Sequence, residues 1–407
     1  MPISSSAAFV AQQQDAQRIC QRLGNMDCVG QTWLRIGRSQ VLHPESKTDV
    51  EQARAIFARV GDERRVAEAQ NALGVLQMDQ GNFADARREY SEARATCEKI
   101  GDRSCVTQEI LNDGDIDSEN GEVHAAEREY RKALVLARQT GEDQLIWGSL
   151  NNIASVLADY EGNLAEAETI DRELVETDRK SGKEARMIFT LSNLGAVLAE
   201  EGHLAEARRI LMEVEQRSIN SGGRAEYGSS AVTLAEIDVV EGHPSAAEAR
   251  LRPMAKFLED EHHNFAAVYY DGIASAQLAQ RRPSEAQRTA VHARELLRDA
   301  HEGFENYHLQ ITAARVAAAA QPQDAQVQAK SLASLRQVVA QCRKSGFMVL
   351  QFHARLAESQ VEMQSGAMAA GQAHLAALEH EASSRGFGLI ARQASTIRQV
   401  SVAEEAR

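Results

Sequence analysis

The sequence predicts an all-α protein in which antiparallel helix pairs stack as a right-handed superhelical solenoid with a repeat of about 40 residues. Glycine occurs in two interleaved series, at 61, 101, 141, 182, 222, 303, 346 and 386 and at 81, 121, 162, 202 and 242. The composition is typical of an alanine-rich helical protein, with 43% hydrophobic residues, 5% aromatic residues and only six prolines in 407. Runs of β-branched residues bounded by turn residues, which would indicate strands, are missing from the sequence.

Each repeat is expected to contain two helices joined by a glycine turn. One clear repeat covers residues 61–100 and the next covers 101–140. The pair Gly101-Asp102 can end one helix in a left-handed cap and place an acid at the positive end of the next helix. The second glycine series, as in Gly81-Asn82, makes the turn within a pair. About 18 to 20 helices and no sheet are therefore expected.

Small residues recur where two helices must touch. In the first helices they are Gly74, Gly114, Ser155, Gly195, Ala235 and Ala274, and in the second helices Ala86, Ala126, Ala167, Ala207, Ala247 and Ala286. Larger residues follow four positions later, at Tyr90, Tyr130, Leu211 and Leu251, and should fill the gaps. Asp171 occupies this position in its own repeat and is a departure that weakens it.

A uniform repeat overrides the usual relation between length and domain number, because each repeat contacts only its neighbours. We expect one continuous domain over residues 1–407. Within it, residues 1–60 form atypical N-terminal repeats, residues 61–250 form clear repeats, and residues 251–407 form divergent repeats that keep the spacing.

The pattern is similar to the tetratricopeptide repeat, whose first helix carries Leu-Gly and whose second helix carries alanine, an aromatic residue and alanine. Leu73-Gly74 with Ala86, Tyr90 and Ala93 matches this pattern. The unit is about 40 residues long rather than about 34. This length resembles that of large bacterial regulator solenoids, and the resemblance implies a protein that binds a partner.

The C-terminal part resembles the repeat region of bacterial serine/threonine protein kinases. The resemblance lies in SGFMVLQFHARLAESQVEMQSG from Ser345 and in RGFGLIARQA from Arg385. The chain has neither a His-Arg-Asp catalytic loop nor an Asp-Phe-Gly motif, so no kinase domain is expected within it. We expect no enzymatic activity and no cofactor.

The net charge of −14 and the isoelectric point of about 5.4 disfavour a nucleic-acid partner, which requires a basic surface, and favour a basic protein or peptide. No apolar run approaches the roughly 18 residues of a membrane span. The N-terminus lacks a basic leader followed by an apolar core, so we expect a cytoplasmic protein with reduced thiols.

Asparagine recurs on the first helices at Asn71, Asn112, Asn152 and Asn193. Amides at this spacing form a ladder on the inner surface and can both donate to and accept from an extended peptide. With Asp115, these residues are the predicted partner-binding site. The alternative is that the amides join the helices of neighbouring repeats by hydrogen bonds.

Other polar clusters are expected to be structural. The acids from Asp113 to Glu122 lack the spacing of a calcium loop and should form a solvated or partner-facing surface. Cys20 and Cys28, and Cys97 and Cys105, flank turns and are expected to be buried small residues, with a redox pair as the alternative. No metal site is expected, because histidines in adjacent repeats lie too far apart.

These observations favour a non-catalytic scaffold that binds a peptide or protein partner on its concave face. The alternative is the sensory or regulatory repeat segment of a bacterial signalling kinase or transcription regulator. The open ends of a solenoid also permit self-association.

Overall fold

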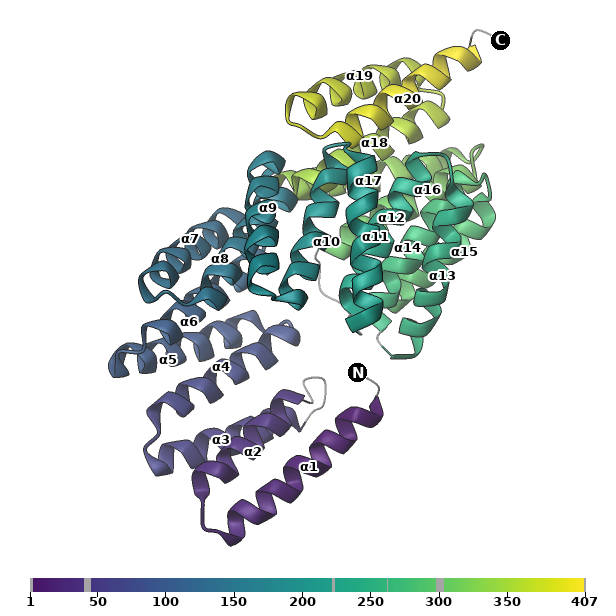
Figure 1. Ribbon diagram of the computed structural model, residues 1–407. Helices are drawn as coiled ribbons and strands as arrows, with labels where there is room; N and C mark the ends of the chain where they lie inside the picture. The colour runs from purple at the N-terminus through teal and green to yellow at the C-terminus, as the bar shows by residue number, and fades with distance from the viewer. Residues whose placement is uncertain (1–2, 40–44, 222–223, 262, 298–303, 406–407) are drawn as a thin grey trace. The chain divides into compact units, whose positions relative to one another are not determined.

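The protein is an all-α solenoid, as the sequence predicts. The computed structural model describes residues 3–39, 45–221, 224–261, 263–297 and 304–405, and in these ranges it contains 20 α-helices, one π-helical segment and no strand (Figure 1). The helix number agrees with the expected 18 to 20. None of the helices in these ranges is both long and apolar enough to cross a membrane.

The helices form two compact units. Unit 1 (residues 1–152) contains α1 (Ile3–Arg22), α2 (Met26–Ser39), α3 (Ser46–Val60), α4 (Glu63–Asp79), α5 (Phe83–Ile100), α6 (Arg103–Glu119), α7 (Val123–Thr140) and most of α8 (Asp143–Val156). Unit 2 (residues 153–407) contains the end of α8, η1 (Leu157–Glu161), α9 (Leu164–Ser181), α10 (Glu184–Glu200), α11 (Leu204–Ser221), α12 (Arg224–Val240), α13 (Pro244–Glu261), α14 (His263–Ala279), α15 (Pro283–Leu296), α16 (Phe304–Ala320), α17 (Ala325–Ser345), α18 (Met348–Gln364), α19 (Met368–Ser384) and α20 (Gly388–Glu405). A single continuous domain stays a prediction.

Glycine and aspartate set the boundaries between repeats in the predicted way. Gly101 ends α5 with a left-handed φ of 73°, which a residue with a Cβ adopts only at a cost. The Asp102 side chain then accepts a hydrogen bond of 3.0 Å from the backbone N–H of Cys105 and caps α6. Arg281 takes the same left-handed conformation, with a φ of 60°, where the preceding repeats have glycine.

The pairing of small with large residues holds the two helices of each repeat together. A Cβ on Gly114 would lie 2.6 Å from Cε1 of Tyr130, and one on Gly195 would lie 2.6 Å from Cγ of Leu211. The aromatic or branched side chain therefore occupies the space that the glycine leaves free. Ala86, Ala126 and Ala207 are completely buried, which confirms the predicted contact positions.

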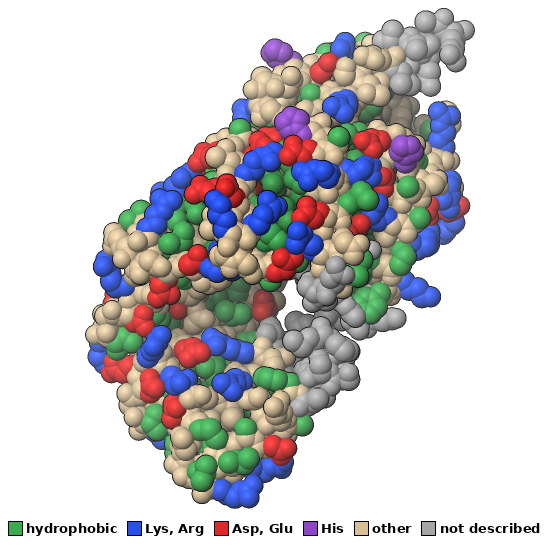
Figure 2. Space-filling model, viewed as in Figure 1, with side chains coloured by type: hydrophobic (Ala, Val, Ile, Leu, Met, Phe, Trp, Pro, Cys, Tyr) green, Lys and Arg blue, Asp and Glu red, His purple; other side chains and the backbone are tan. Residues whose placement is uncertain are grey.

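In unit 2 the first helices α10, α12, α14, α16, α18 and α20 pack on one another in succession. Ion pairs join neighbouring second helices, such as Arg172 of α9 with Glu206 of α11 at 3.0 Å. The visible face of the molecule accordingly shows interspersed acidic and basic side chains (Figure 2). Exposed pairs of this kind contribute little to stability individually, so the packed apolar surfaces carry the fold.

Unit 2 closes on itself. Tyr160 of η1 lies against Phe347, which precedes α18, with ring centroids 4.7 Å apart. Arg392 of α20 donates a hydrogen bond of 3.3 Å to the carbonyl oxygen of Gly202. A Cβ on Gly202 would lie 3.1 Å from the carbonyl carbon of Gly388, so these two glycines allow the turn between α10 and α11 to meet the start of α20.

The cysteine pairs correct one expectation. Cys20 is bonded to Cys28 and Cys97 to Cys105, with Cα atoms 5.7 and 5.8 Å apart, whereas reduced thiols were expected. Each bond joins the end of an outer helix to the start of the following inner helix, because the left-handed turn between them brings residues eight apart together. Cys342 is a buried free cysteine.

Two glycines in unit 1 test the small-to-large packing. Gly114→Ala should lower the free energy of unfolding by about 1–3 kcal/mol, because the new methyl group overlaps Tyr130. The control is Gly148→Ala, where a Cβ would meet only Cδ1 of Leu111 at 3.9 Å, and where the alanine should stabilise by about 0.5–1 kcal/mol. Urea unfolding measures both, and equal effects would contradict the packing argument.

The disulfides predict a stability difference between oxidised and reduced protein. Each disulfide links two cysteines that are eight positions apart in the sequence, and closing this loop should add roughly 2–3 kcal/mol to the free energy of unfolding. Replacing both Cys97 and Cys105 by alanine should lower the free energy of unfolding by this amount under oxidising conditions and have a smaller effect under reducing ones. If thiol titration of the denatured, non-reduced protein finds more than the single thiol of Cys342, the assigned pairing is wrong.

Candidate functional site

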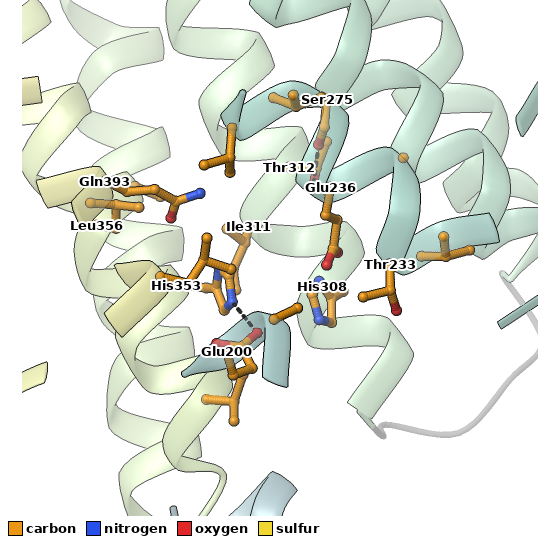
Figure 3. Close-up of a pocket in the computed structure, with 18 of the residues that line it drawn as sticks. Glu200, Thr233, Glu236, Ser275, His308, Ile311, Thr312, His353, Leu356 and Gln393 are labelled. Carbon is orange, nitrogen blue, oxygen red and sulfur yellow. Dashed lines mark hydrogen bonds and ion pairs between the residues drawn. The ribbon is translucent and has the colours of Figure 1, made fainter. Parts of the chain in front are cut away.

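The candidate site is a cavity of about 930 Å³ inside unit 2. Its walls are the inner faces of the first helices α10, α12, α14, α16 and α18, completed by η1, α9 and α20. Glu200, Glu236, His308 and His353 come from four different helices and point into this space (Figure 3). The cavity exists because the unit closes on itself and brings the far ends of the unit to one site.

The repeat determines which residues face the cavity. Residues at the same position of each inner helix project from the same face, so a polar side chain at one position adds to those of its neighbours. Glu236 of α12 follows the small residue Ala235, as Asp115 follows Gly114 in unit 1. Apolar side chains such as Val197 and Leu356 line the space between the polar groups.

Carboxylates are the most numerous charged groups in the lining. The cavity contains five of them and three arginines, and the five carboxylates are Asp159, Asp171, Glu200, Glu236 and Asp271. Asp171 and Asp271 are 1% and 8% exposed, and each has one carboxylate oxygen, Oδ1, that is buried without a hydrogen-bond partner. The other oxygen of Asp271 accepts a hydrogen bond of 3.0 Å from Thr312.

Enclosure by the walls raises the pKa values of these acids. Desolvation, together with the charge of Asp159, raises the pKa of Asp171 to about 8. Desolvation is also the first cause at Asp159, Glu236 and Asp271, and it raises the pKa of each to about 7. Asp159 and Glu236 are exposed on the cavity wall, whereas Asp171 and Asp271 are buried in it. These groups therefore take up or release protons near neutral pH.

Two histidines face the carboxylates from α16 and α18. Nε2 of His353 lies 3.6 Å from Oε1 of Glu200 (Figure 3). Desolvation lowers the pKa of His353, but the neighbouring carboxylates Glu200 and Glu236 raise it by more, so the net shift is upward. Desolvation and the proximity of His353 lower the pKa of His308 to about 3, so His308 is neutral. The two rings lie with centroids 6.0 Å apart.

The predicted asparagine ladder is present, and its amides in unit 1 bind carboxylates of the protein itself. Asn71 of α4 donates to both oxygens of Glu109 in α6, at 2.9 and 3.1 Å, and Asn112 donates to the same carboxylate at 3.1 Å. Asn152 donates to Asp115 at 3.0 Å, and Tyr130 donates to it at 2.8 Å. The geometry matches the alternative of hydrogen bonds between repeats, and partner binding by these residues stays a prediction.

Asn193 belongs to unit 2, whereas the other three asparagines belong to unit 1, and it lines the cavity. It is the one predicted site residue that contributes to this site. The sequence analysis did not identify the other cavity residues, because they come close together only when the unit closes on itself. The repeat position that Glu236 shares with Asp115 was the available signal.

The acidic stretch of α6 corrects a second expectation. Asp113 is 7% exposed and pairs with Arg94 at 2.8 Å, and Asp117 pairs with Arg87 at 2.5 Å. Most of these acids are thus held within unit 1 instead of forming a solvated surface. The arginines that pair with these acids lie on α5, and the spacing of the acids alone does not reveal them.

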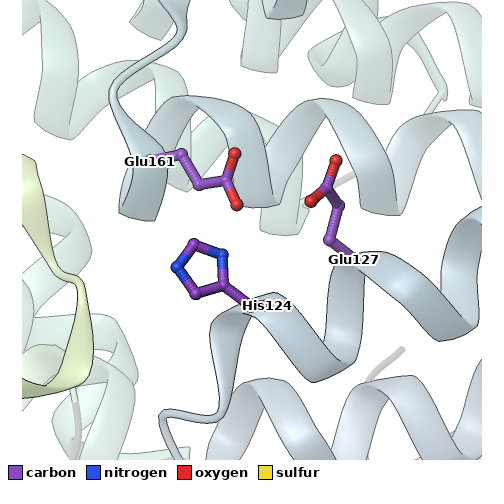
Figure 4. A group of neighbouring side chains, drawn as sticks. All are labelled: His124, Glu127 and Glu161. Atoms are coloured by element: carbon purple, nitrogen blue, oxygen red, sulfur yellow. The ribbon is translucent and has the colours of Figure 1, made fainter.

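A histidine and a glutamate also lie together on α7. His124 and Glu127 are one turn apart on the same side of this helix, and Figure 4 draws them with Glu161, which belongs to unit 2. Two ligands from one helix are fewer than the three or four protein ligands of a zinc site. Unit 1 on its own therefore does not provide a metal site at this position.

Neither a protein-family model nor a curated protein matches the chain in sequence. The apo form of the quorum sensor NprR from B. thuringiensis is similar in structure, with a TM-score of 0.55, 14% identity, and coverage of 83% of this chain and 98% of that chain. NprR in complex with its cognate peptide NprX gives a TM-score of 0.54 at 13% identity, with 83% and 99% covered. Aspartyl phosphate phosphatase F from Bacillus subtilis gives 0.53 at 11% identity, with 69% and 73% covered. At these identities the likeness is one of fold: a solenoid of tetratricopeptide-like helix pairs.

Proposed function

We propose that unit 2 binds a short peptide in its cavity and that the protein is a non-catalytic, peptide-binding scaffold. The observation that carries the proposal is the closed inner surface of unit 2, which combines apolar walls with unpaired carboxylate oxygens. Its volume of about 930 Å³ lies in the range of about 300–1,000 Å³ of specific ligand pockets. The similar fold of NprR, which has been solved with its cognate peptide, supports a peptide as the ligand.

The charge of the lining selects a basic peptide. Five carboxylates face three arginines, so the cavity is negative when the acids are ionised. A cationic ligand then replaces the protons that the acids otherwise bind. Electrostatic complementarity of this kind determines which ligand binds and how fast it associates.

The second candidate is a regulatory role, in which peptide binding in unit 2 controls a signalling or transcription domain. The similarity to NprR favours it, because that protein is a quorum sensor. The closure of unit 2 supplies a physical basis, since a ligand in the cavity contacts both ends of the unit and favours one arrangement of the ends. An effector domain encoded in frame with this chain would support the regulatory role over a simple scaffold.

The cytoplasmic location expected from the sequence belongs to this proposal, and the two disulfides bear on it. Disulfides are rare in reducing compartments. If Cys20–Cys28 and Cys97–Cys105 are disulfide-bonded in cells, a cytoplasmic location is contradicted, whereas four free thiols would support it. Alkylation of acid-quenched cells followed by mass spectrometry measures their state.

Filling the cavity should weaken peptide binding. Thr233 lies on the cavity wall, so Thr233→Trp should lower the affinity for a pool of short basic peptides by about tenfold or more. The control is Val291→Trp on α15, which is 51% exposed and outside the lining. Equilibrium dialysis with mass spectrometry measures retention of the pool, and equal retention by the two variants would place the peptide elsewhere.

Affinity for a basic peptide should rise with pH between about pH 6 and pH 9. The acids with pKa values raised to about 7 and 8 are largely protonated at the lower end and ionised at the upper end, and only the ionised form attracts a cation. Calorimetry in buffers of different ionisation enthalpy should also detect proton release at neutral pH. An affinity that falls as pH rises over this interval would contradict the electrostatic role of the carboxylates.

A further inference from the structure

Asp171 stands where the repeat calls for a large apolar residue. The equivalent positions hold Tyr90, Tyr130, Leu211 and Leu251, each four residues after a buried alanine. In those repeats the side chain fills the space beside a small residue of the first helix. In the α8–α9 repeat, the small residue is Ser155 and its counterpart is a carboxylate.

The carboxylate of Asp171 is buried and incompletely paired. Asp171 is 1% exposed, and its Oδ1 atom has no hydrogen-bond partner. A buried polar atom left without a partner destabilises a fold, and a leucine at this position would avoid that cost. A residue that breaks the local rule without a compensating contact marks a functional position more often than a structural one.

A second carboxylate adjoins it from an irregular segment. Asp159 lies in η1, where the helix widens to π geometry between Leu157 and Glu161. Such segments are found frequently at functional sites, because they redirect side chains that a regular helix would place elsewhere. Asp159 and Asp171 interact electrostatically, and both line the cavity.

We propose that Asp171 and Asp159 form a subsite for one organic cationic group, the ammonium or guanidinium group of the bound peptide. This inference rests on the proposed function, since the cavity must hold a peptide for the subsite to act. The cation would donate hydrogen bonds to the unpaired carboxylate oxygen and neutralise a pair of acids that repel one another. Within the structure's described residues, no third ligand joins the two acids at metal-binding distance, and this favours an organic cation over a metal ion.

The subsite predicts opposite effects of one substitution on stability and on binding. Asp171→Leu restores the apolar residue of the repeat, so it should raise the midpoint of thermal unfolding while it lowers retention of basic peptides by about tenfold or more. Asp171→Asn keeps the shape and should lower retention without the gain in packing. Glu173→Gln is the matched control, since it removes an exposed acid from the same helix and should change neither property.

The probes are two pools of short synthetic peptides that differ only at their basic positions. One pool carries lysine or arginine, and the other carries acetyllysine or citrulline at the same positions with acetylated N-termini. The wild-type protein and Glu173→Gln should retain the first pool at least tenfold better, and the Asp171 variants should lose this preference. Separate lysine and arginine pools distinguish the ammonium from the guanidinium group.

The outcomes separate the two proposals. Equal retention of both pools by the wild-type protein, or an unchanged preference in Asp171→Leu and Asp171→Asn, would overturn the cationic subsite and leave peptide binding intact. If the wild-type protein retains neither pool, the proposed function fails and the subsite fails with it. A folded Asp171→Leu variant with a lower unfolding midpoint would show that the carboxylate serves packing instead of binding.

Discussion

The contact between the two ends of unit 2 is the constraint on which its cavity depends. Tyr160 packs against Phe347, and the turn at Gly202 approaches Gly388 so closely that a Cβ on Gly388 would overlap the carbonyl oxygen of Glu201. Without this contact, the inner helices would form an open groove and their carboxylates would face bulk water. The raised pKa values of the carboxylates and the neutral state of His308 follow from desolvation inside the unit.

The fold could be predicted because its determinants are local and repeated. The left-handed turn at Gly101, the cap at Asp102 and the overlap of Gly114 with the ring of Tyr130 each involve residues within one repeat. A sequence reveals such interactions through spacing alone. Even the divergent repeats after residue 251 form helix pairs, because helix packing needs small residues and apolar volume more than a fixed signature.

The site could be predicted only in part. The contact between the two ends of unit 2 results from many small rotations between successive repeats, and no single spacing in the sequence shows their sum. No spacing in the sequence indicates that Arg392 reaches Gly202, which lies 190 residues earlier. Asp171 was visible as a departure from the repeat, but the sequence alone does not show that it is buried or that Asp159 of η1 lies near it. The asparagines of unit 1 donate hydrogen bonds to Glu109 and Asp115, and the sequence analysis did not foresee this role for either carboxylate.

The closure of unit 2 also constrains how the protein can evolve. Open solenoids gain and lose repeats readily, since an added unit extends the stack without disturbing the others. In unit 2 an added helix pair would separate Gly202 from Gly388 and open the ring. The contact between Gly202 and Gly388 therefore limits unit 2 to its present number of helix pairs. New ligand preferences would then arise by substitutions on the inner helices, at positions such as Glu236, and not by duplication of repeats.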